Sequence, residues 1–226
     1  MRANTAGKSA RKHRVFLVED HPVTREGFAQ LINYQPDLAV CGQAGTAAKA
    51  ITGIDVLKPG LVIVDISLAE SSGLELIKQL KTRYPLLRML VLSMHDEALY
   101  AERALRAGAR GYVMKQAPTT EVMNAIRTVL RGDLYLSEAM RTRLVHKHLT
   151  DRVPARASDI ETLSDRELEV FERLGHGLTT RRIAGKLHLS ISTVETHRAH
   201  IKQKLKLANA VELVRRAVEW VNRQPK

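Results

Sequence analysis

Short apolar runs separated by amphipathic stretches dominate the first 133 residues. The runs are VFLV from Val15, LAVCG from Leu38, LVIV from Leu61, MLVLS from Met89 and GYVM from Gly111. Each gap between them is long enough for one helix, and strands that alternate with helices pair in parallel through right-handed crossovers. The pattern therefore predicts an α/β domain over residues 15–133, with a five-stranded, doubly wound parallel sheet.

Helix boundaries in this region can be read from proline and glycine. Pro22 and Pro118 stand at the start of two predicted helices, and Gly73 precedes LELIKQLKTRY. Gly108 and Gly132 follow two helical patterns, where a left-handed cap favours glycine. These signals give the predicted helices definite ends.

The strand pattern stops after Asp133. SEAMRTRLVHKHL predicts one more helix and TDRVPARAS a polar linker, so we assign residues 134–160 to a helical linker. From Glu161 onward every pattern is a short helix, and Ser164 with Glu167 and Asn209 with Glu212 have capping-box spacing. Two of these helices are joined by so short a turn that residues 161–226 predict an all-α, four-helix domain of the helix-turn-helix type.

The charge of the chain is concentrated at its ends. The net charge is +12; residues 1–14 carry 5 Lys and Arg and no acidic residue, residues 15–133 carry 13 of each sign, and residues 134–226 carry 18 against 11. A basic carboxyl-terminal domain beside a neutral one favours a polyanion partner on the former, nucleic acid before membrane. Residues 1–14 form a basic tail.

The sequence offers no sign of membrane insertion or disulfide chemistry. No apolar run approaches the roughly 18 residues of a membrane span, and the first 14 residues lack the apolar centre of a signal peptide. The chain has one cysteine, so no intramolecular disulfide can form. We expect a cytoplasmic protein without a membrane partner.

Polar side chains follow the predicted strands where four of them end. Glu19 and Asp20 follow the first, Asp65 the third, Ser93 the fourth and Lys115 the fifth. Because parallel strands end at one edge of a sheet, we expect these groups to share a pocket. Clustered carboxylates favour a hard cation such as Mg²⁺, and lysine with a hydroxyl beside it suits phosphate.

The longest predicted helix of the carboxyl-terminal domain has an inward and an outward face. Val194, His197, Ile201 and Leu205 recur at steps of three and four residues, which predicts the inward stripe. The outward face carries short polar residues bordered by lysines, an arrangement that suits a major groove with base edges in the middle and phosphates at the rims. Arg198 lies beside the inward stripe, so an internal salt bridge competes with a phosphate contact.

The last helix has an apolar arc wider than a small domain needs. Its members are Ala210, Leu213, Val214, Ala217, Val218, Trp220 and Val221. A stripe of about 100° is enough to cover one core. The rest of the arc predicts dimerisation on DNA.

Two independent motif sets carry a family resemblance over nearly the whole chain. VEDHP, IVDIS, LSMHD and GYVMKQA resemble the flavodoxin-like receiver domain of two-component response regulators. LSDRELEVFERLGHGLTTRRIAGKLHLSISTVETHRAHIKQKL resembles a LuxR-type helix-turn-helix. Together they resemble the NarL/FixJ family of transcription regulators, which implies a DNA-binding regulator rather than an enzyme.

The resemblance implies a role for each residue of the strand-end pocket. Asp65 would accept a phosphoryl group from a sensor histidine kinase, with Mg²⁺ as cofactor. The implied metal ligands are Glu19, Asp20, Asp65 and the backbone carbonyl of Ser67. Ser93 and Lys115 would contact the phosphoryl group, and Tyr112 would be the aromatic switch that turns inward with Ser93.

The helix-turn-helix likeness and the outward helix face together give a set of DNA-binding candidates. They are Ser192, Thr193, Glu195, Thr196, Ala199, Lys202 and Lys204. The implied partners are double-stranded promoter DNA, RNA polymerase and a second copy of the chain, in a homodimer promoted by phosphorylation. One departure from the family pattern is Lys206, which stands where glycine is common.

Three other interpretations remain open at this point. Asp65 could simply cap the following helix. A phosphatase of the haloacid dehalogenase type also has an aspartate nucleophile after a strand, but its second aspartate would fall at Ser67. A phosphorylation-independent interaction module is the third, although such proteins tend to lose the aspartate or the lysine.

Overall fold

The computed structural model describes residues 12–68, 72–149, 159–187 and 189–223, and it confirms the predicted α/β domain. The predicted tail residues 1–11 and the linker residues 150–158 lie outside the described part. The strands are β1 (His13–Val18), β2 (Leu38–Ala44), β3 (Leu61–Val64), β4 (Arg88–Ser93) and β5 (Tyr112–Met114). The helices of this domain are α1 (Pro22–Asn33), α2 (Ala47–Leu57), α3 (Gly73–Arg83), α4 (Glu97–Ala107) and α5 (Thr119–Arg131).

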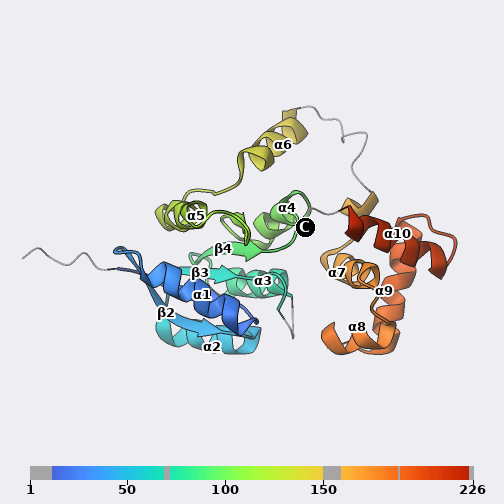
Figure 1. Cartoon of the computed structure of the whole chain (residues 1–226), viewed down its shortest axis with the longest axis horizontal. Coiled ribbons are helices and arrows are strands. Elements are labelled where there is room, and N and C mark those ends of the chain that lie inside the picture. Colours follow the sequence, from blue (N-terminus) through green and yellow to red (C-terminus); the bar gives the residue numbers. More distant parts are fainter. Residues whose placement is uncertain (1–11, 69–71, 150–158, 188, 224–226) are drawn as a thin grey trace, which may run out of the picture.

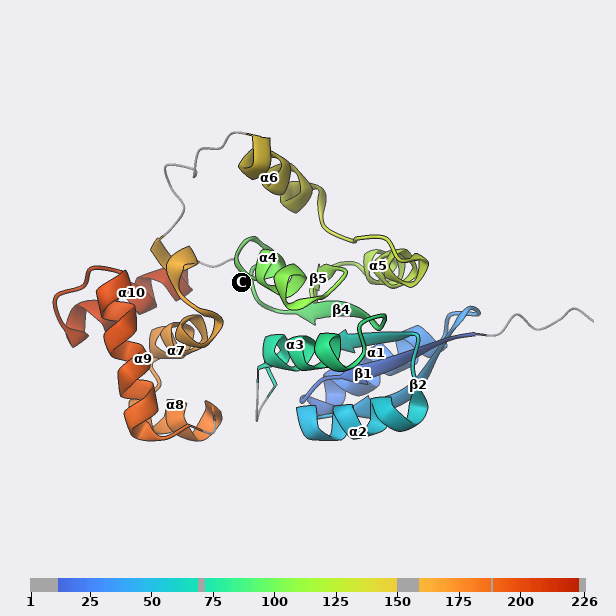
Figure 2. The ribbon, with the colours of Figure 1, turned by 180° about the vertical axis from the view of Figure 1, so that it is seen from behind.

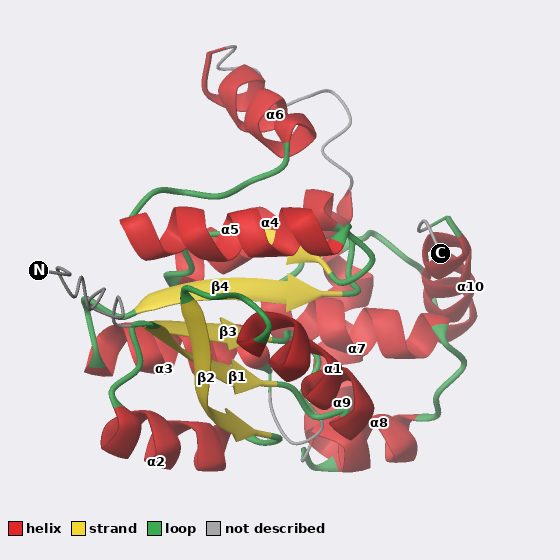
Figure 3. Cartoon of the chain, turned by 60° about the vertical axis from the view of Figure 1, so that its left-hand side comes forward, coloured by secondary structure: helices red, strands yellow, loops and turns green. Residues whose placement is uncertain are grey.

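All pairs of neighbouring strands are parallel, in the order β2-β1-β3-β4-β5. Side chains alternate between the two faces of the sheet, so Val15 and Leu17 pack toward α1 and α5, whereas Phe16 and Val18 pack toward α2, α3 and α4. Figure 3 shows the strands between these two layers, with their carboxyl ends directed toward α7. Gly108 and Gly132 end α4 and α5 with φ of 118° and 97°, as the sequence predicts.

The predicted domain boundaries are displaced by a few residues. β1 starts at His13, inside the predicted tail, because its backbone pairs with Leu38 whatever the polarity of the side chain. At the other boundary Tyr135 pairs with Gly111, so the first residues of the predicted linker complete the edge of the sheet. Helix α6 (Glu138–Leu149) follows and extends away from the sheet (Figure 1).

The carboxyl-terminal domain contains a short 3₁₀ helix, η1, and four α-helices, as predicted. Their bounds are η1 (Asp159–Thr162), α7 (Asp165–Gly175), α8 (Thr180–Leu187), α9 (Ile191–Lys204) and α10 (Ala210–Asn222). η1 starts two residues before the predicted domain, because Ile160 is buried in the core. Figure 2 shows α8 and α9 joined by a short turn. Among the described helices, none is both long and apolar enough to cross a membrane.

Both predicted capping sites are present, with one difference. Ser164 and Glu167 exchange side-chain and backbone hydrogen bonds, which makes a complete capping box at the start of α7. Asn209 accepts from the backbone of Val211 and Glu212 at the start of α10, but the Glu212 carboxylate binds the backbone of Ala208 instead of Asn209. The second cap therefore lacks the reciprocal bond.

Helix α9 ends in a Schellman motif with a lysine at the position that favours glycine. The Leu207 N–H donates to the Lys202 carbonyl at 2.9 Å, and the Lys206 N–H donates to the Gln203 carbonyl at 3.2 Å. Lys206 has a φ of 54°, in the left-handed region. A side chain with a Cβ is strained there, so the family's preference for glycine has a local physical cause.

We expect Lys206→Gly to raise the free energy of unfolding of the carboxyl-terminal domain by about 1 kcal/mol, because removing the left-handed strain outweighs the extra entropy of unfolded glycine. Lys202→Gly, inside the same helix, is the matched control and should lower it by about 1 kcal/mol. Urea denaturation followed by circular dichroism measures both. A loss of stability with Lys206→Gly would contradict this account of the turn.

Candidate functional site

The carboxyl ends of β1, β3 and β5 place a buried lysine between two buried carboxylates. The ammonium Nζ of Lys115 lies 2.5 Å from Glu19 Oε2 and 2.8 Å from Asp65 Oδ2. All three side chains are nearly enclosed, with exposed fractions of 9%, 6% and 3%. Burial raises the pKa of Asp65, and Lys115 opposes this shift. The predicted pocket is therefore present, and Lys115 neutralises part of its negative charge.

One oxygen of Asp65 has no hydrogen-bond partner. Oδ2 accepts from Lys115, whereas Oδ1 is buried and unsatisfied. The N-cap of α3 is Ser72, so the interpretation of Asp65 as a helix cap is wrong. Gly73 packs closely on the backbone of Asp65, since a Cβ there would fall 2.0 Å from the Asp65 carbonyl oxygen. The side-chain oxygen Oδ1 is left available for an incoming group.

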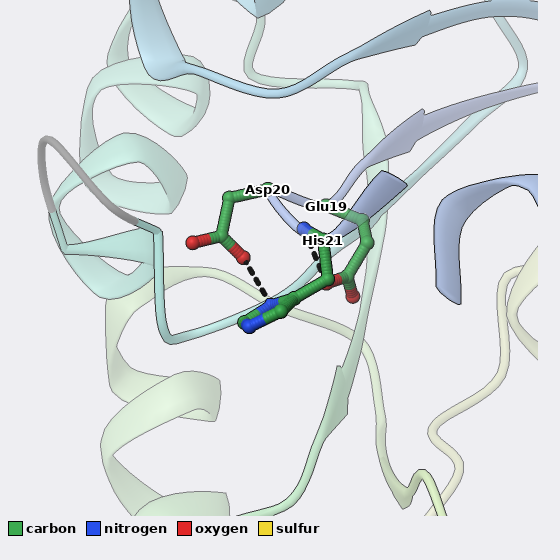
Figure 4. Close-up of side chains that lie close together, drawn as sticks. All are labelled: Glu19, Asp20 and His21. Atoms are coloured by element: carbon green, nitrogen blue, oxygen red, sulfur yellow. Dashed lines mark hydrogen bonds and ion pairs between the residues drawn. The ribbon is translucent and has the colours of Figure 1, made fainter. Parts of the chain in front are cut away.

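A second acidic cluster lies beside this pair and includes a histidine that the sequence analysis did not select. Glu19, Asp20 and His21 each offer one ligand atom, and these atoms lie within 4.8 Å of one another (Figure 4). The Nδ1 atom of His21 is 2.8 Å from Asp20 Oδ1 and 3.3 Å from Glu19 Oε1. His21 is therefore close enough to compete with a cation for these oxygens.

The donor set fits a magnesium ion. It is rich in carboxylate oxygens, and the Asp65 Oδ1 atom is desolvated without a partner, which is unfavourable unless a cation or ligand binds it. In the part of the chain that the structure describes, the metal-ligand cluster contains Glu19, Asp20 and His21, and Asp65 does not belong to it. Asp65 is held by Lys115 instead.

The predicted switch residues Ser93 and Tyr112 meet at one residue, His95. The His95 N–H donates to Ser93 Oγ at 3.2 Å, and the Tyr112 hydroxyl donates to the His95 carbonyl at 2.7 Å. Tyr112 is fully buried, so its ring already points inward. The side chain of His95 lies 2.5 Å from Ser67 Oγ through Nε2. Ser67, Ser93 and Tyr112 are thus connected through His95.

The α/β domain contacts the carboxyl-terminal domain beside this site. His95 Nδ1 lies 2.9 Å from Glu172 Oε1 on α7, and the Tyr100 hydroxyl donates to Glu172 Oε2 at 3.1 Å. Burial opposes the charged form of both His95 and Glu172, but their mutual contact prevails: the pKa of His95 is raised and that of Glu172 is lowered. They form an ion pair between the domains.

A second polar contact lies further along the same boundary. Asp165, the first residue of α7, accepts from Lys78 at 2.9 Å and from Arg103 at 2.9 Å. The two domains line a cavity of about 810 Å³, with Asp65, His95 and Lys115 on the side of the α/β domain and Glu172 and Trp220 on the other side. The strand-end pocket therefore opens into the space between the domains.

The outward face of α9 is exposed as predicted, but its glutamate is bound within the domain. Glu195 Oε1 accepts from Thr180 and from Arg198, both at 2.8 Å. This is the internal salt bridge that the sequence left open for Arg198. Thr196 and Ala199 are exposed beside Glu195, so the predicted base-facing surface is accessible.

The remaining candidates divide between free and engaged side chains. The hydroxyls of Ser192 and Thr193 both contact Ser190 Oγ, at 2.7 and 2.8 Å, and order the start of α9. The ammonium of Lys204 donates to the buried Glu167 carboxylate at 2.6 Å. A phosphate contact by Lys204 would compete with that ion pair, whereas Lys202 forms no ion pair within the part of the chain that the structure describes.

Three residues of the site were missed by sequence reasoning, for different reasons. His21 adjoins the acidic pair, and this adjacency was an available signal. His95 lies two residues beyond Ser93, which is a weaker signal. For Glu172 the sequence contains no such signal, because Glu172 is 77 residues from its partner His95 and lies in an amphipathic helix.

Comparison with known proteins agrees with this geometry. A family model described as response regulator receiver domain matches residues 15–127, and one described as bacterial regulatory proteins, luxR family, matches residues 161–217. Both models describe regulatory proteins and neither a catalytic enzyme, which excludes the phosphatase interpretation.

Curated relatives extend over almost the whole chain. Oxygen regulatory protein NreC of Staphylococcus carnosus (strain TM300) is 34% identical over 210 residues, 91% of this chain and 97% of that protein. The protein of the same name from Staphylococcus aureus (strain MRSA252) is 35% identical over 210 residues, with the same coverage.

Solved structures show the same fold. A two-component response regulator of the LuxR family from Aurantimonas sp. SI85-9A1 is 30% identical, covers 61% of this chain and 99% of its own, and has a TM-score of 0.57. RcsB of Salmonella enterica serovar Typhimurium, bound to promoter rprA with the phosphomimetic BeF3-, is 24% identical, covers 92% of this chain and 99% of its own, and has a TM-score of 0.66. The chain belongs to the NarL/FixJ-type response regulators, in which a receiver domain is joined to a LuxR-type DNA-binding domain.

Proposed function

We propose that Asp65 accepts a phosphoryl group from a sensor histidine kinase and that phosphorylation controls the binding of a cytoplasmic dimer to promoter DNA. The observation that carries this proposal is the unpartnered Oδ1 of Asp65, beside the buried ammonium of Lys115. A phosphoryl group bonded to Oδ1 would have its oxygens near a fixed positive charge. Transcription is then regulated directly, or through contact with RNA polymerase.

The chemistry follows from the two oxygens of Asp65. Oδ1 attacks the phosphorus of the donor, the bond from phosphorus to the kinase histidine nitrogen breaks, and an aspartyl phosphate forms. Lys115 already binds Asp65 and Glu19, and the third N–H of its ammonium can bind a phosphoryl oxygen. Ser93 supplies a hydroxyl from the adjacent strand.

Receiver domains generally depend on Mg²⁺ for phosphorylation, and this one offers a suitable set of ligands. We assign the ion to Glu19, Asp20, Asp65 and the backbone carbonyl of Ser67. When bound, Mg²⁺ would neutralise the carboxylates and the phosphoryl oxygens together. His21 would have to leave Asp20 for the ion to enter.

We expect the full-length protein to incorporate phosphate from a small acyl phosphate in the presence of Mg²⁺, and Asp65→Asn to incorporate none, because an amide is not a nucleophile. Radiolabelled phosphate measures both proteins. Asp133→Asn is the control, since its carboxylate is 65% exposed and pairs with Arg131 on the surface, and it should label normally. Labelling of Asp65→Asn at the normal level would contradict the assignment.

We propose that α9 lies in the major groove with Glu195, Thr196 and Ala199 toward base edges and Lys202 toward phosphate. Ser192 and Thr193 would contact the backbone at the start of the helix, and Lys204 would do so only after releasing Glu167. A glutamate can accept a hydrogen bond from cytosine but is repelled by phosphate. It should therefore select among bases more than it adds affinity.

Replacing Glu195 and Lys202 should affect DNA binding in different ways. Glu195→Ala should relax base preference at one position of each half-site by roughly 1 to 3 kcal/mol, whereas Lys202→Ala should weaken all sequences alike and lower the salt slope by about one. Binding selections and salt titrations measure these effects. Because Glu195 also binds Thr180 and Arg198, Glu195→Gln is the control for local packing and should keep the helix in place. An unchanged motif with Glu195→Ala would exclude base readout by Glu195.

We propose α10 as a dimer contact on DNA. Val211 and Val214 lie one turn apart on α10 and are exposed by 77% and 37%, whereas Leu213 and Ala217 are buried in the domain. Exposed valines at this spacing form an apolar strip that a second copy can cover. Phosphorylation should shift association by roughly 1 to 3 kcal/mol of coupling.

We expect Val211→Glu to weaken binding to a paired half-site by about tenfold or more while leaving binding to a single half-site unchanged, because only the former requires two copies. Val56→Glu is the matched control, since Val56 is equally exposed at 76% but lies on α2 of the receiver. Sedimentation and gel-shift titrations, with and without a phosphoryl mimic, measure the effect. Equal loss on single and paired sites would show that α10 is not the dimer contact.

A further inference from the structure

His95 binds three residues that surround the proposed acceptor site, Ser67, Ser93 and Tyr112. Its N–H donates to Ser93 Oγ, its carbonyl accepts from Tyr112, and its ring contacts Ser67 Oγ. Ser67 belongs to the loop after Asp65, and Ser93 and Tyr112 lie at the ends of β4 and β5. A change at any of these positions therefore changes the hydrogen bonds of His95.

The second ring nitrogen of His95 is bound by the other domain. Because an ionised carboxylate can only accept, Nδ1 of His95 carries a hydrogen and donates it to Glu172 Oε1 at 2.9 Å. Glu172 is fixed in turn by the Tyr100 hydroxyl, and the Tyr100 ring lies 4.6 Å from the His95 ring. His95 and Glu172 are 17% and 18% exposed, so little water competes for this bond.

These contacts hold the end of β4 in place. Ser93 Oγ, the proposed phosphoryl contact, accepts from the N–H of His95, so any shift of Ser93 toward a phosphoryl group would draw His95 with it. His95 can follow only if its ring leaves Ser67 or Glu172. The position of α7 thus restrains the strand end that the phosphoryl group must move.

We propose that His95 and Glu172 are positioning residues that couple the acceptor site to domain docking: Glu172, although part of the DNA-binding domain, restrains the phosphoryl-binding geometry of Asp65. This inference rests on the proposed function of Asp65. Coupling between two events is reciprocal, so a phosphoryl group that releases His95 also weakens the docking of α7.

The structure indicates which part of the DNA-binding domain this docking restrains. The outward residues of α9 are exposed while the domains are docked, so base contacts are not covered. Trp220, Val221 and Asn222 at the end of α10 line the cavity shared with the receiver. The end of α10, and not the outward face of the recognition helix, therefore borders the space between the domains.

The chain provides its own reporter for a test. Trp220 is the only tryptophan, and it lines the cavity that contains Asp65. Beryllium fluoride with Mg²⁺ is the probe, and its apparent Kd can be read from Trp220 fluorescence and checked by calorimetry. We expect Glu172→Ala to tighten beryllium fluoride binding by about fivefold or more, the lower range of measured couplings. Glu172→Gln should give a smaller effect, because its neutral amide still accepts a weaker hydrogen bond.

A double-mutant cycle separates this coupling from a general loosening of the domains. We expect His95→Gln and Glu172→Ala to be non-additive in beryllium fluoride affinity, because either change breaks the same connection. Asp165→Asn is the matched control: it weakens the contacts to Lys78 and Arg103 without touching His95, and it should be additive with His95→Gln.

Each other outcome has a definite meaning. Failure of the wild-type protein to bind beryllium fluoride would overturn the proposed function of Asp65. Normal wild-type binding with an unchanged Kd in Glu172→Ala would overturn only the coupling. Equal non-additivity of Asp165→Asn with His95→Gln would show that docking as a whole matters, and not the contact between His95 and Glu172.

Discussion

The interaction on which the site depends is the buried ammonium of Lys115 between Glu19 and Asp65. Two enclosed carboxylates that contact one ammonium would otherwise repel each other, and Lys115 offsets part of this repulsion. Removing one member of such a group leaves an uncompensated buried charge, which costs about 3 to 5 kcal/mol. The same ammonium binds only Oδ2 of Asp65, and this leaves Oδ1 as the unsatisfied acceptor. The ammonium of Lys115 therefore both stabilises the buried carboxylates and leaves one oxygen of Asp65 available for reaction.

Sequence reasoning located this site because it needed only topology. Once the alternating runs predict parallel strands, Glu19, Asp65 and Lys115 must lie at one edge, and the structure confirms that they touch. The same holds for Ser164 and Glu167, whose spacing alone defines a cap. Predictions of this kind succeed because backbone geometry fixes the outcome. At Lys206 the sequence shows an unusual residue after a helix, but the strain of that residue is visible only in its φ angle.

The contacts that sequence reasoning did not resolve depend on long side chains that have several possible partners. Lys204 was assigned to the rim of the DNA face, yet its ammonium pairs with Glu167 on another helix. Glu195 was placed on the outward face, and it is exposed there, but it also binds Thr180 and Arg198. Periodicity predicts on which face of the helix a side chain starts. It does not predict where the charged end of a long, flexible side chain lies. The partnership of His95 with Glu172 joins two domains and lies further still beyond any local pattern.

The composition of the domain boundary determines how strongly the two halves can be coupled. Among the described residues, the polar bonds across it centre on Glu172 and Asp165, and buried apolar residues of both domains belong to one continuous cluster. His95 belongs both to this boundary and to the proposed acceptor site. A shift of Ser93 therefore acts directly on the contact between His95 and Glu172, without a rearrangement of the hydrophobic core.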